Sequence, residues 1–201
     1  MAFVKNTAFE QRISNHEFES TANITGKYQA SSADADCSAG LLCVRATLMA
    51  NEGYTNINND NTWVMNAAGA SDLAQKGIYA CNPGNVNTIV DSGTGAKYKV
   101  GSNTLGLGIP AGDRDTFTKI FFNNDNVYRF GVGNINGTIG SNTIFTIAAG
   151  MLIPASAAPT ANGAPYFELV GTGKFTQGAY QGFDYYDLRA CMAVGSTSTG
   201  G

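Results

Sequence analysis

This chain contains almost no histidine and few charged residues. Of its 201 residues, one is a histidine, His16, and only 13% are aspartate, glutamate, lysine or arginine. Most enzymes that move protons hold a histidine or a carboxylate next to a nucleophile. His16 lies in a polar stretch. Its sequence neighbours Ser14 and Glu17 carry a hydroxyl and a carboxylate, but no catalytic motif surrounds them. The sequence therefore predicts no catalytic residue, and we expect a protein that is not an enzyme.

Clusters of basic residues are also missing. The 12 lysines and arginines are scattered, Lys97 and Lys99 being the nearest to a cluster, and the formal net charge is −3. A protein that binds DNA or RNA relies on clustered cations that replace counterions at the phosphates. We therefore expect no nucleic-acid partner.

Long apolar segments are absent as well. Residues 144 to 158 form the longest, and Gly150 and Pro154 interrupt it, whereas a membrane-spanning helix needs roughly 20 apolar residues. The N-terminal sequence Met-Ala-Phe-Val-Lys-Asn-Thr lacks the apolar stretch of a secretory signal. We therefore expect no membrane partner and a product made in a cytoplasm.

Cysteine patterns typical of metal sites are missing too. The chain has four cysteines and no close Cys-x-x-Cys or Cys-His pair, so the sequence predicts neither a metal site nor a cofactor. Three of them lie in apolar segments, where a free thiol packs as a small hydrophobic group. We expect buried thiols, because disulfides are rare in a cytoplasm. Oxidation would leave three pairings open among Cys37, Cys43, Cys81 and Cys191.

What the sequence does contain is a series of short strand-like segments, separated by turns rich in glycine and asparagine. Residues 116 to 120 alternate polar and apolar side chains, as a strand with one wet face does. The Asn-rich loop at residues 123 to 126 predicts a β-hairpin between its two flanking strands. A short helix is the alternative for residues 41 to 49, the first strand that we predict. The predicted strands are residues 41 to 49, 62 to 65, 77 to 81, 87 to 90, 97 to 100, 116 to 122, 127 to 132, 143 to 147, 166 to 170 and 185 to 194.

Many short strands and 25 glycines predict a mainly β protein with a compact β-sandwich or barrel-like domain. We place this β-rich domain at residues 31 to 194. Residues 1 to 30 are polar with isolated aromatic residues and predict an extended N-terminal arm, in which residues 9 to 20 could form a short helix. Residues 195 to 201 are Ser, Thr and Gly and predict a short C-terminal tail.

Close pairs of carboxylates are the remaining candidates for acid–base chemistry. Paired acids hydrolyse glycosides when they face each other across a cleft. Adjacent acids in a turn point apart, so we interpret these residues as loop charges and keep a hydrolase as the least favoured hypothesis. The pairs are Asp34 with Asp36, Asp113 with Asp115, and Asp184 with Asp187.

Two Asn-Asn-Asp-Asn segments, residues 58 to 61 and 123 to 126, offer oxygen atoms that a calcium ion could use. Each has one carboxylate, and neither has the fixed glycine and terminal glutamate of an EF-hand. We interpret both segments as turns, with calcium binding as the open alternative.

Residues 175 to 186 interleave aromatic residues with glycines, and the aromatic residues are Phe175, Tyr180, Phe183, Tyr185 and Tyr186. Rings on such a backbone suit a protein interface or stacking on a sugar, although packing in the core explains them equally well. A carbohydrate-binding or adhesion module is therefore an alternative function, with Tyr180 and Tyr185 in its stacking platform.

An aromatic-bearing arm, β segments rich in Gly, Ala and Asn, and a Ser/Thr/Gly tail together resemble the virion proteins of tailed bacteriophages. Residues 77 to 84, 107 to 112 and 147 to 154 are similar in style to capsid decoration proteins, which stabilise heads. The resemblance extends over most of the chain and assigns no role to an individual residue. It implies a structural protein of the virion, made in the host bacterial cytoplasm, with a phage tail tube or fibre component as the alternative.

Decoration proteins bind the outer face of an assembled shell between major capsid subunits. The resemblance therefore implies the major capsid protein as partner, together with self-association on the particle as an oligomer. We expect residues 1 to 20 and 175 to 186 to form contact surfaces. Deletion of residues 1 to 20 should then weaken binding to particles and leave the β domain folded.

Overall fold

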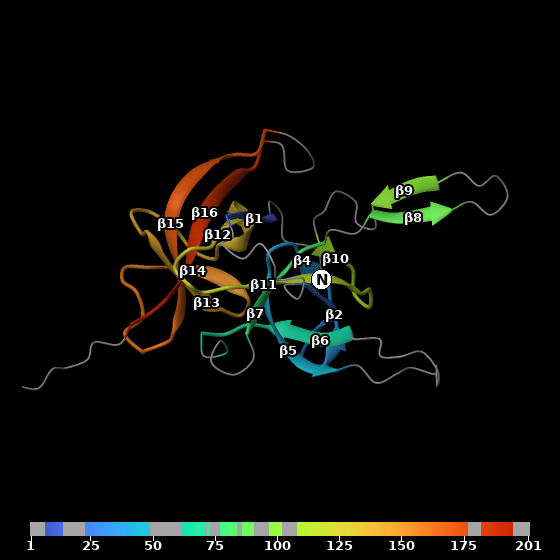
Figure 1. Cartoon of the computed structure of the whole chain (residues 1–201), viewed down its shortest axis with the longest axis horizontal. Helices are drawn as coiled ribbons and strands as arrows, with labels where there is room; N and C mark the ends of the chain where they lie inside the picture. Colours follow the sequence, from blue (N-terminus) through green and yellow to red (C-terminus); the bar gives the residue numbers. More distant parts are fainter. Residues whose placement is uncertain are drawn as a thin grey trace, which may run out of the picture.

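The computed structural model describes residues 7–13, 23–48, 62–70, 72, 77–83, 86–90, 97–101, 108–176 and 182–194. It confirms the mainly β fold and shows two large sheets (Figure 1). One is a closed barrel of five strands, and the other is an open six-stranded sheet, which we call sheet A. The predicted barrel-like architecture is therefore correct for one of these two sheets.

The barrel closes on itself in the order β11-β7-β5-β6-β2, because β11 also pairs with β2. All neighbouring strands are antiparallel except β2 and β6, which run parallel. Closure pairs both edges of β11, so that strand has no edge left for another partner. The barrel strands are β2 (Asn23–Ala30), β5 (Leu42–Leu48), β6 (Thr62–Ala67), β7 (Ile78–Cys81) and β11 (Asp115–Ile120).

Sheet A is antiparallel throughout and has the order β1-β12-β16-β15-β13-β14. Its long central pair, β15 and β16, forms the curved ribbon at the upper left of Figure 1. The strands of sheet A are β1 (Phe9–Ile13), β12 (Val127–Gly131), β13 (Ile144–Ala148), β14 (Met151–Ala155), β15 (Pro165–Lys174) and β16 (Asp184–Met192).

Short elements complete the described part of the chain. The two residues of β3 pair with the end of β2, β4 pairs with β10, and β8 forms with β9 a hairpin at the periphery (Figure 1). A single 3-10 turn, η2, follows β12. Their bounds are β3 (Ala33–Asp34), β4 (Cys37–Ser38), β8 (Val86–Val90), β9 (Lys97–Gly101), β10 (Gly108–Ile109) and η2 (Val132–Asn134).

Side chains of the barrel strands alternate between two cores, as the two-residue period of a strand requires. In β7, Tyr79 and Cys81 face the interior of the barrel, whereas Ile78 and Ala80 join a core outside it. The interior has no room to spare, because a Cβ on Gly26 would lie 2.5 Å from Cγ of Met65. The interior core comprises Cys37, Cys43, Met65, Tyr79, Cys81, Ile109 and Phe117.

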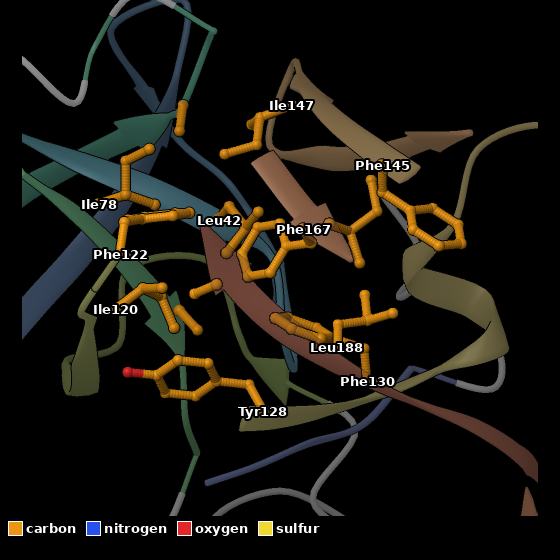
Figure 2. Close-up of a cluster of buried hydrophobic side chains, with 14 of the residues drawn as sticks. Leu42, Ile78, Ile120, Phe122, Tyr128, Phe130, Phe145, Ile147, Phe167 and Leu188 are labelled. Atoms are coloured by element: carbon orange, nitrogen blue, oxygen red, sulfur yellow. The ribbon is translucent and has the colours of Figure 1, made fainter. Parts of the chain in front are cut away.

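Sheet A packs against the outside of the barrel through a second, larger core (Figure 2). Phe167 of sheet A contacts Phe122, which follows β11, and Phe130 on β12, with ring centroids 5.1 and 5.6 Å apart. Because one core unites both sheets, we expect them to fold as one cooperative unit. Its largest members include Leu42, Ile78 and Ile120 from the barrel and Tyr128, Phe145, Ile147, Phe167 and Leu188 from sheet A.

The turn between β13 and β14 joins sheet A to the barrel. Leu42 N–H donates to the Gly150 carbonyl at 2.9 Å, Gly150 N–H donates to Ala68 at 2.8 Å, and Ala68 N–H donates to Leu42 at 2.9 Å. Gly150 has a φ of +76°, and a Cβ there would lie 2.8 Å from the Leu42 carbonyl oxygen. Glycine alone fits this position, so part of the phage-like segment at residues 147 to 154 is a structural joint.

Within the predicted arm, the structure describes residues 7–13 and 23–30, and both stretches are mostly strand. The helix predicted for residues 9 to 20 is wrong where it is described, because Phe9–Ile13 is β1, paired with β12. An isolated short helix with a sparse apolar stripe is unstable in water, whereas pairing with β12 supplies backbone hydrogen bonds. Residues 23–30 form β2 of the barrel, so the β structure begins before residue 31.

A buried asparagine anchors the start of β1. Asn134 Oδ1 accepts a hydrogen bond from Ala8 N–H at 3.0 Å, and Asn134 Nδ2 donates one to the Ala39 carbonyl at 2.7 Å. Gly40 lies beside this contact, and a Cβ on it would approach Asn134 Nδ2 to 2.6 Å. One amide thereby joins β1, η2 and the segment that leads into the barrel.

The hairpin predicted around residues 123 to 126 is wrong, although both of its strands exist. They are β11 and β12, which belong to different sheets and do not pair with each other. Each has a neighbour on both edges, β7 and β2 for β11, and β1 and β16 for β12. The loop instead carries the chain between the sheets: Asn124 N–H donates to Ala190, and Ala190 N–H donates to Asn126.

The other predicted strands are confirmed, with ends that differ by a few residues. The sequence pattern missed β1 to β4, β10 and β14. Pro154, which interrupts the longest apolar segment, lies in β14 at the edge of sheet A, where a missing N–H breaks no ladder. The predicted tail, residues 195 to 201, lies outside the described residues. Within the described part of the chain, no helix has the length and apolarity needed to cross a membrane.

Candidate interface at the mouth of the barrel

The carboxylates of the first predicted pair make separate local contacts. Asp34 accepts hydrogen bonds from Gln29 Nε2 at 3.0 Å and from Lys27 Nζ at 3.1 Å, and these bonds lower the pKa of Asp34. Asp36 Oδ1 accepts a hydrogen bond from the Ala111 N–H at 3.0 Å. Both acids therefore stabilise the loop structure around β3.

Asp113 is exposed, and three other predicted acids are likewise engaged one by one. Asp115 is buried, and its Oδ1 accepts the Thr116 N–H at 2.7 Å. Asp184 forms an exposed ion pair with Lys174 at 2.7 Å. Asp187 belongs to a separate cluster on sheet A. These contacts favour the interpretation of the acids as structural charges.

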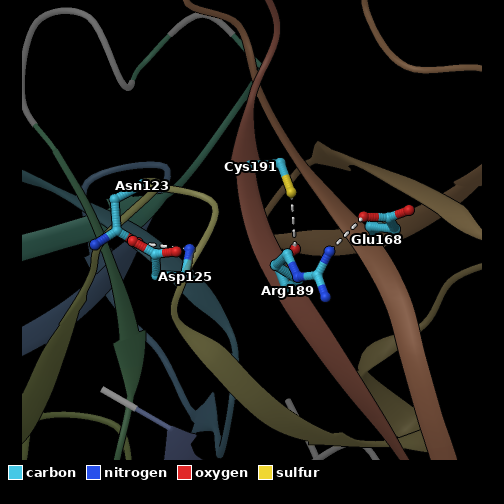
Figure 3. Close-up of polar contacts among 5 residues, drawn as sticks. All are labelled: Asn123, Asp125, Glu168, Arg189 and Cys191. Carbon is cyan, nitrogen blue, oxygen red and sulfur yellow. Dashed lines mark hydrogen bonds and ion pairs between the residues drawn. The ribbon is translucent and has the colours of Figure 1, made fainter. Parts of the chain in front are cut away.

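The predicted calcium segment at residues 123 to 126 has the geometry of a turn. Asn123 Oδ1 accepts hydrogen bonds from the N–H groups of Asp125 and Asn126, both at 3.2 Å (Figure 3). The side-chain oxygen thereby closes its own loop, as an Asx-turn does. Residues 58 to 61 lie outside the described residues, as does His16. Among the described residues, no group of three or more His, Cys, Asp or Glu is placed to hold a metal ion.

The four cysteines are free and buried, as the sequence predicts. Cys37, Cys43 and Cys81 gather inside the barrel, beside Tyr28. Burial raises the pKa of the Cys37 and Cys81 thiols, and it raises the pKa of Tyr28 to about 12. A nucleophilic thiol needs a lowered pKa, so the environment of Cys37 and Cys81 is that of packing residues.

Ion pairs follow the face of sheet A that points away from the barrel. Arg189 Nη1 lies 3.3 Å from Glu168 Oε2 on the neighbouring strand, and Cys191 Sγ donates to the Arg189 carbonyl at 3.7 Å (Figure 3). The side chains of Arg189 and Glu168 are 43% and 44% exposed. Surface pairs of this kind contribute little to stability.

Part of the predicted aromatic segment surrounds Arg129 on the same face. The Nε and Nη2 atoms of Arg129 donate to the two carboxylate oxygens of Asp187, each at 2.8 Å. The guanidinium carbon lies 3.5 Å from the centre of the Tyr185 ring, and Phe175 meets that ring edge-on at 5.1 Å. The ring crosses Gly173, where a Cβ would lie 2.5 Å from the Tyr185 Oη. We call Arg129, Tyr185 and Asp187 the Arg129 cluster.

Two rings of the aromatic segment, Phe175 and Tyr185, are thus engaged by the protein itself. Phe175 is 7% exposed, and Arg129 covers one face of Tyr185. A ring covered in this way does not offer that face to a sugar, so the geometry does not favour Tyr185 as a sugar-stacking platform. Tyr180 lies outside the described residues.

A different set of side chains gathers at one end of the barrel. Because β5 and β11 run opposite to β6 and β7, the inward positions occupied by Arg45, Trp63, Tyr79 and Lys119 come to the same end. Phe121 follows β11 there, and Met192 at the end of β16 lies beside it. We call these six residues the barrel mouth: Arg45, Trp63, Tyr79, Lys119, Phe121 and Met192.

Both cations of the barrel mouth lie over aromatic rings. The guanidinium carbon of Arg45 is 4.9 Å from the centre of the Trp63 ring and 5.5 Å from that of Tyr79. Lys119 Nζ is 4.8 Å from the centre of the Phe121 ring. A cavity of about 380 Å³ opens between Arg45, Lys119 and their neighbours, with Tyr79 as a buried wall. This is the size range of small-ligand and side-chain pockets.

The barrel mouth also differs in its ion pairing from four other described cations. Lys27, Arg129, Lys174 and Arg189 each have a carboxylate partner within ion-pair distance. In the described part of the chain, the cations of the mouth contact aromatic rings and no carboxylate.

No protein-family model, curated protein or solved structure matches this chain. Its own geometry therefore has to indicate what the barrel mouth binds. Trp, Tyr, Arg and Met are the residue types enriched in the buried centre of protein interfaces. Exposed apolar side chains belong to this surface or adjoin it, because Met192 is 42% exposed and Leu48, which pairs with Trp63 on the neighbouring strand, is 47% exposed.

The sequence pattern did not predict the barrel mouth, although two signals were present. Arg45 is the one charged residue in the apolar strand predicted at residues 41 to 49, and Lys119 occupies an inward position in the alternating strand at residues 116 to 120. A charged residue at a position that the strand pattern predicts to be buried indicates that something other than core packing, such as binding, determines the residue there. Only the fold shows which strands bring their residues to this end of the barrel.

Proposed function

We propose that this chain is a non-enzymatic structural protein of a bacteriophage particle, a decoration protein that binds and stabilises the outer surface of the capsid through the barrel mouth. The observation that carries the proposal is the barrel mouth, a rigid set of Trp, Tyr, Arg and Met side chains with exposed apolar neighbours. The resemblance of the sequence to phage virion proteins favours a bacteriophage particle as the location. The barrel mouth offers a surface for the proposed partner, the major capsid protein.

The fold suits a protein that binds as a rigid body. One core unites the barrel and sheet A, and the hydrogen-bonded ring at Gly150 fixes their junction. A preorganised surface loses little conformational entropy on binding, so more of its contact energy contributes to affinity. A shell subject to internal pressure is held best by such a stiff connector.

The test is co-sedimentation of the purified protein with capsids that lack it. We expect saturable binding and a higher temperature of capsid disruption when the sites are filled. A folded sample that stays in the supernatant would overturn the proposal. Binding to tail tubes or fibres, and not to capsids, would assign the chain to the alternative tail component.

The contribution of the N-terminal segment needs a narrower deletion than the sequence suggests. Removing residues 1 to 20 also removes buried Phe9 and the Ala8 N–H that Asn134 accepts from, so it would destabilise the fold. A deletion of residues 1 to 6 avoids both effects. If this segment contacts the capsid, the shorter deletion weakens binding with an unchanged free energy of unfolding; full occupancy would remove residues 1 to 6 from the proposed interface.

A further inference from the structure

The Arg129 cluster and the barrel mouth share two of three components. Each holds an arginine against an aromatic ring, over Tyr185 in one case and over Trp63 and Tyr79 in the other. In the Arg129 cluster a carboxylate completes the site through two hydrogen bonds of 2.8 Å. At Arg45 that third component is missing from the described residues, and a cavity lies beside the guanidinium.

We infer that the barrel mouth binds a carboxylate side chain carried by an acidic, apolar-flanked segment of the partner protein, held between Arg45 and Lys119. The identity of that partner as the capsid protein rests on the proposed function. The carboxylate chemistry rests on the barrel mouth alone.

The chemistry of the two cations favours a carboxylate. A guanidinium presents parallel N–H donors that match the two oxygens of a carboxylate, and the ring beneath it fixes the plane of that fork. Lys119 lines the same cavity and adds a second positive charge. An anion between them would relieve the repulsion between two like charges in a partly desolvated site.

The walls of the cavity indicate what flanks the carboxylate. Phe121, Phe122 and Met192 line the same cavity as Arg45, and Met192 is 42% exposed. Apolar side chains next to the acidic residue would cover this wall and exclude water from the ion pair. A long polyanion fits less well, because the chain has a net charge of −3 and would repel it outside the cavity.

The first experiment uses two short probe peptides and the full-length protein, free of capsids. Acetyl-Leu-Glu-Phe-amide carries the carboxylate, and acetyl-Leu-Gln-Phe-amide is its neutral isostere. We expect the Glu peptide to shift the NMR signals of the Arg45 Nε–H group and the Met192 methyl group in a saturable titration. The Gln peptide should bind at least about fivefold more weakly, since it lacks the charge-assisted bonds.

Variants locate the effect in the barrel mouth. Arg45→Gln and Lys119→Gln should each weaken the Glu peptide about fivefold or more, whereas Arg45→Lys should restore part of the affinity by restoring charge without the fork. Arg189→Gln is the matched control, because it removes an equal charge from the outer face of sheet A. Equal binding of the Glu and Gln peptides, or full binding by both mouth variants, would overturn the inference.

Further probes separate a carboxylate from other anions. Inorganic phosphate and a thymidine hexanucleotide are titrated under the same conditions. A stronger response of Arg45 to either probe than to the Glu peptide would replace the carboxylate with a phosphate ligand and overturn the inference as stated.

The second experiment tests the same residues on particles. We expect Arg45→Gln to reduce affinity for capsids about tenfold or more, as loss of a central interface arginine does. Wild-type protein that binds the Glu peptide but no capsid would refute the proposed function and leave the carboxylate site intact. Wild-type protein that binds capsids while both mouth variants bind equally well would refute the carboxylate site and leave the proposed function intact.

Discussion

The outer face of sheet A and the barrel mouth use the same residue types for opposite purposes. On sheet A, Arg129 lies flat on Tyr185 and donates two hydrogen bonds to Asp187, so its charge is satisfied within the fold. At the barrel mouth, Arg45 lies between Trp63 and Tyr79 and meets no described carboxylate. The first arrangement stabilises the protein, and the second leaves binding capacity for another molecule.

A cation–aromatic contact is therefore not by itself a sign that a surface binds another molecule. The Arg129 cluster contains Tyr185 of the aromatic segment that we expected to be a contact surface, and this ring is covered by an arginine whose carboxylate partner lies within the fold. A cation indicates a binding site when neighbouring side chains shield it partly from water and no carboxylate of the same protein pairs with it. By that criterion the barrel mouth is the better interface.

The largest expected effect comes from breaking the pair on sheet A. The side chains of Arg129 and Asp187 are only 12% and 21% exposed, so removing either one breaks an ion pair in a partly buried site. We expect Arg129→Ala or Asp187→Ala to lower the free energy of unfolding by about 3 kcal/mol, measured by urea denaturation. Arg189→Ala is the control, with a loss below about 1 kcal/mol because its pair with Glu168 is exposed.

A double variant sharpens that measurement. If the pair acts as a unit, Arg129→Ala combined with Asp187→Ala costs clearly less than the sum of the two single changes. Strict additivity, or a loss no larger than that of Arg189→Ala, would contradict the structural role of the Arg129 cluster.

Alkaline pH should affect the barrel and spare the ion pair of sheet A. Burial raises the pKa of Cys37 and Cys81 in the folded state, so the unfolded chain loses those protons first. Stability is therefore full below roughly pH 8.5, the ordinary thiol pKa, and falls as pH rises toward the folded-state pKa. We expect a loss of about 2 kcal/mol between pH 8 and pH 9.5, measured by urea denaturation at several pH values.

The arginine of the Arg129 cluster stays charged throughout this range. Above pH 10, ionisation of Tyr28 in the unfolded chain adds to the loss, since its pKa is about 12 in the folded protein. Cys37→Ala removes one of the titrating thiols and should show a smaller dependence on pH. An identical pH dependence in that variant would show that other groups cause the loss.

The sequence predicted the β class and most strands because alternation and turn residues are local signals. It failed where the signal depends on distant partners. The loop at residues 123 to 126 has hairpin chemistry, but β2, β7, β1 and β16 occupy the edges that a hairpin would need. Gly150 and Pro154 read as interruptions, although the first is a joint and the second lies in an edge strand.

The candidate site shows the same division. Each residue of the barrel mouth is visible in the sequence, and Arg45 stands out in an apolar strand. Bringing Arg45, Tyr79 and Lys119 to one end of a barrel requires the registers of β5 with β7 and of β7 with β11. No local pattern encodes those registers, so the aromatic content of residues 175 to 186 drew attention to sheet A and not to the barrel mouth.

Two glycines of β15 offer a smaller and cleaner test of the Arg129 cluster. A Cβ on Gly173 would lie 2.5 Å from Tyr185 Oη, whereas one on Gly171 would meet Asp187 at an ordinary 3.6 Å. Gly173→Ala should displace the ring from Arg129 and destabilise the protein by roughly 1 to 2 kcal/mol, measured by thermal or urea unfolding. Gly171→Ala, on the same strand, should be neutral or slightly stabilising. Equal effects at both positions would mean that the Tyr185 ring is not fixed by Arg129.

The smallest expected change in the free energy of unfolding is at the barrel mouth. Arg45→Gln removes contacts with two rings but leaves no carboxylate unpaired in the described part of the chain. We expect the free energy of unfolding to fall by less than about 1 kcal/mol, the usual size of a cation–aromatic contact at a half-exposed site. Lys119→Gln should change it even less, because one ring is its only described contact. Urea denaturation of both variants beside Arg129→Ala provides the measurement. A loss at Arg45 as large as that at Arg129 would mean that Arg45 holds the barrel together, and its charge would then no longer point to a partner.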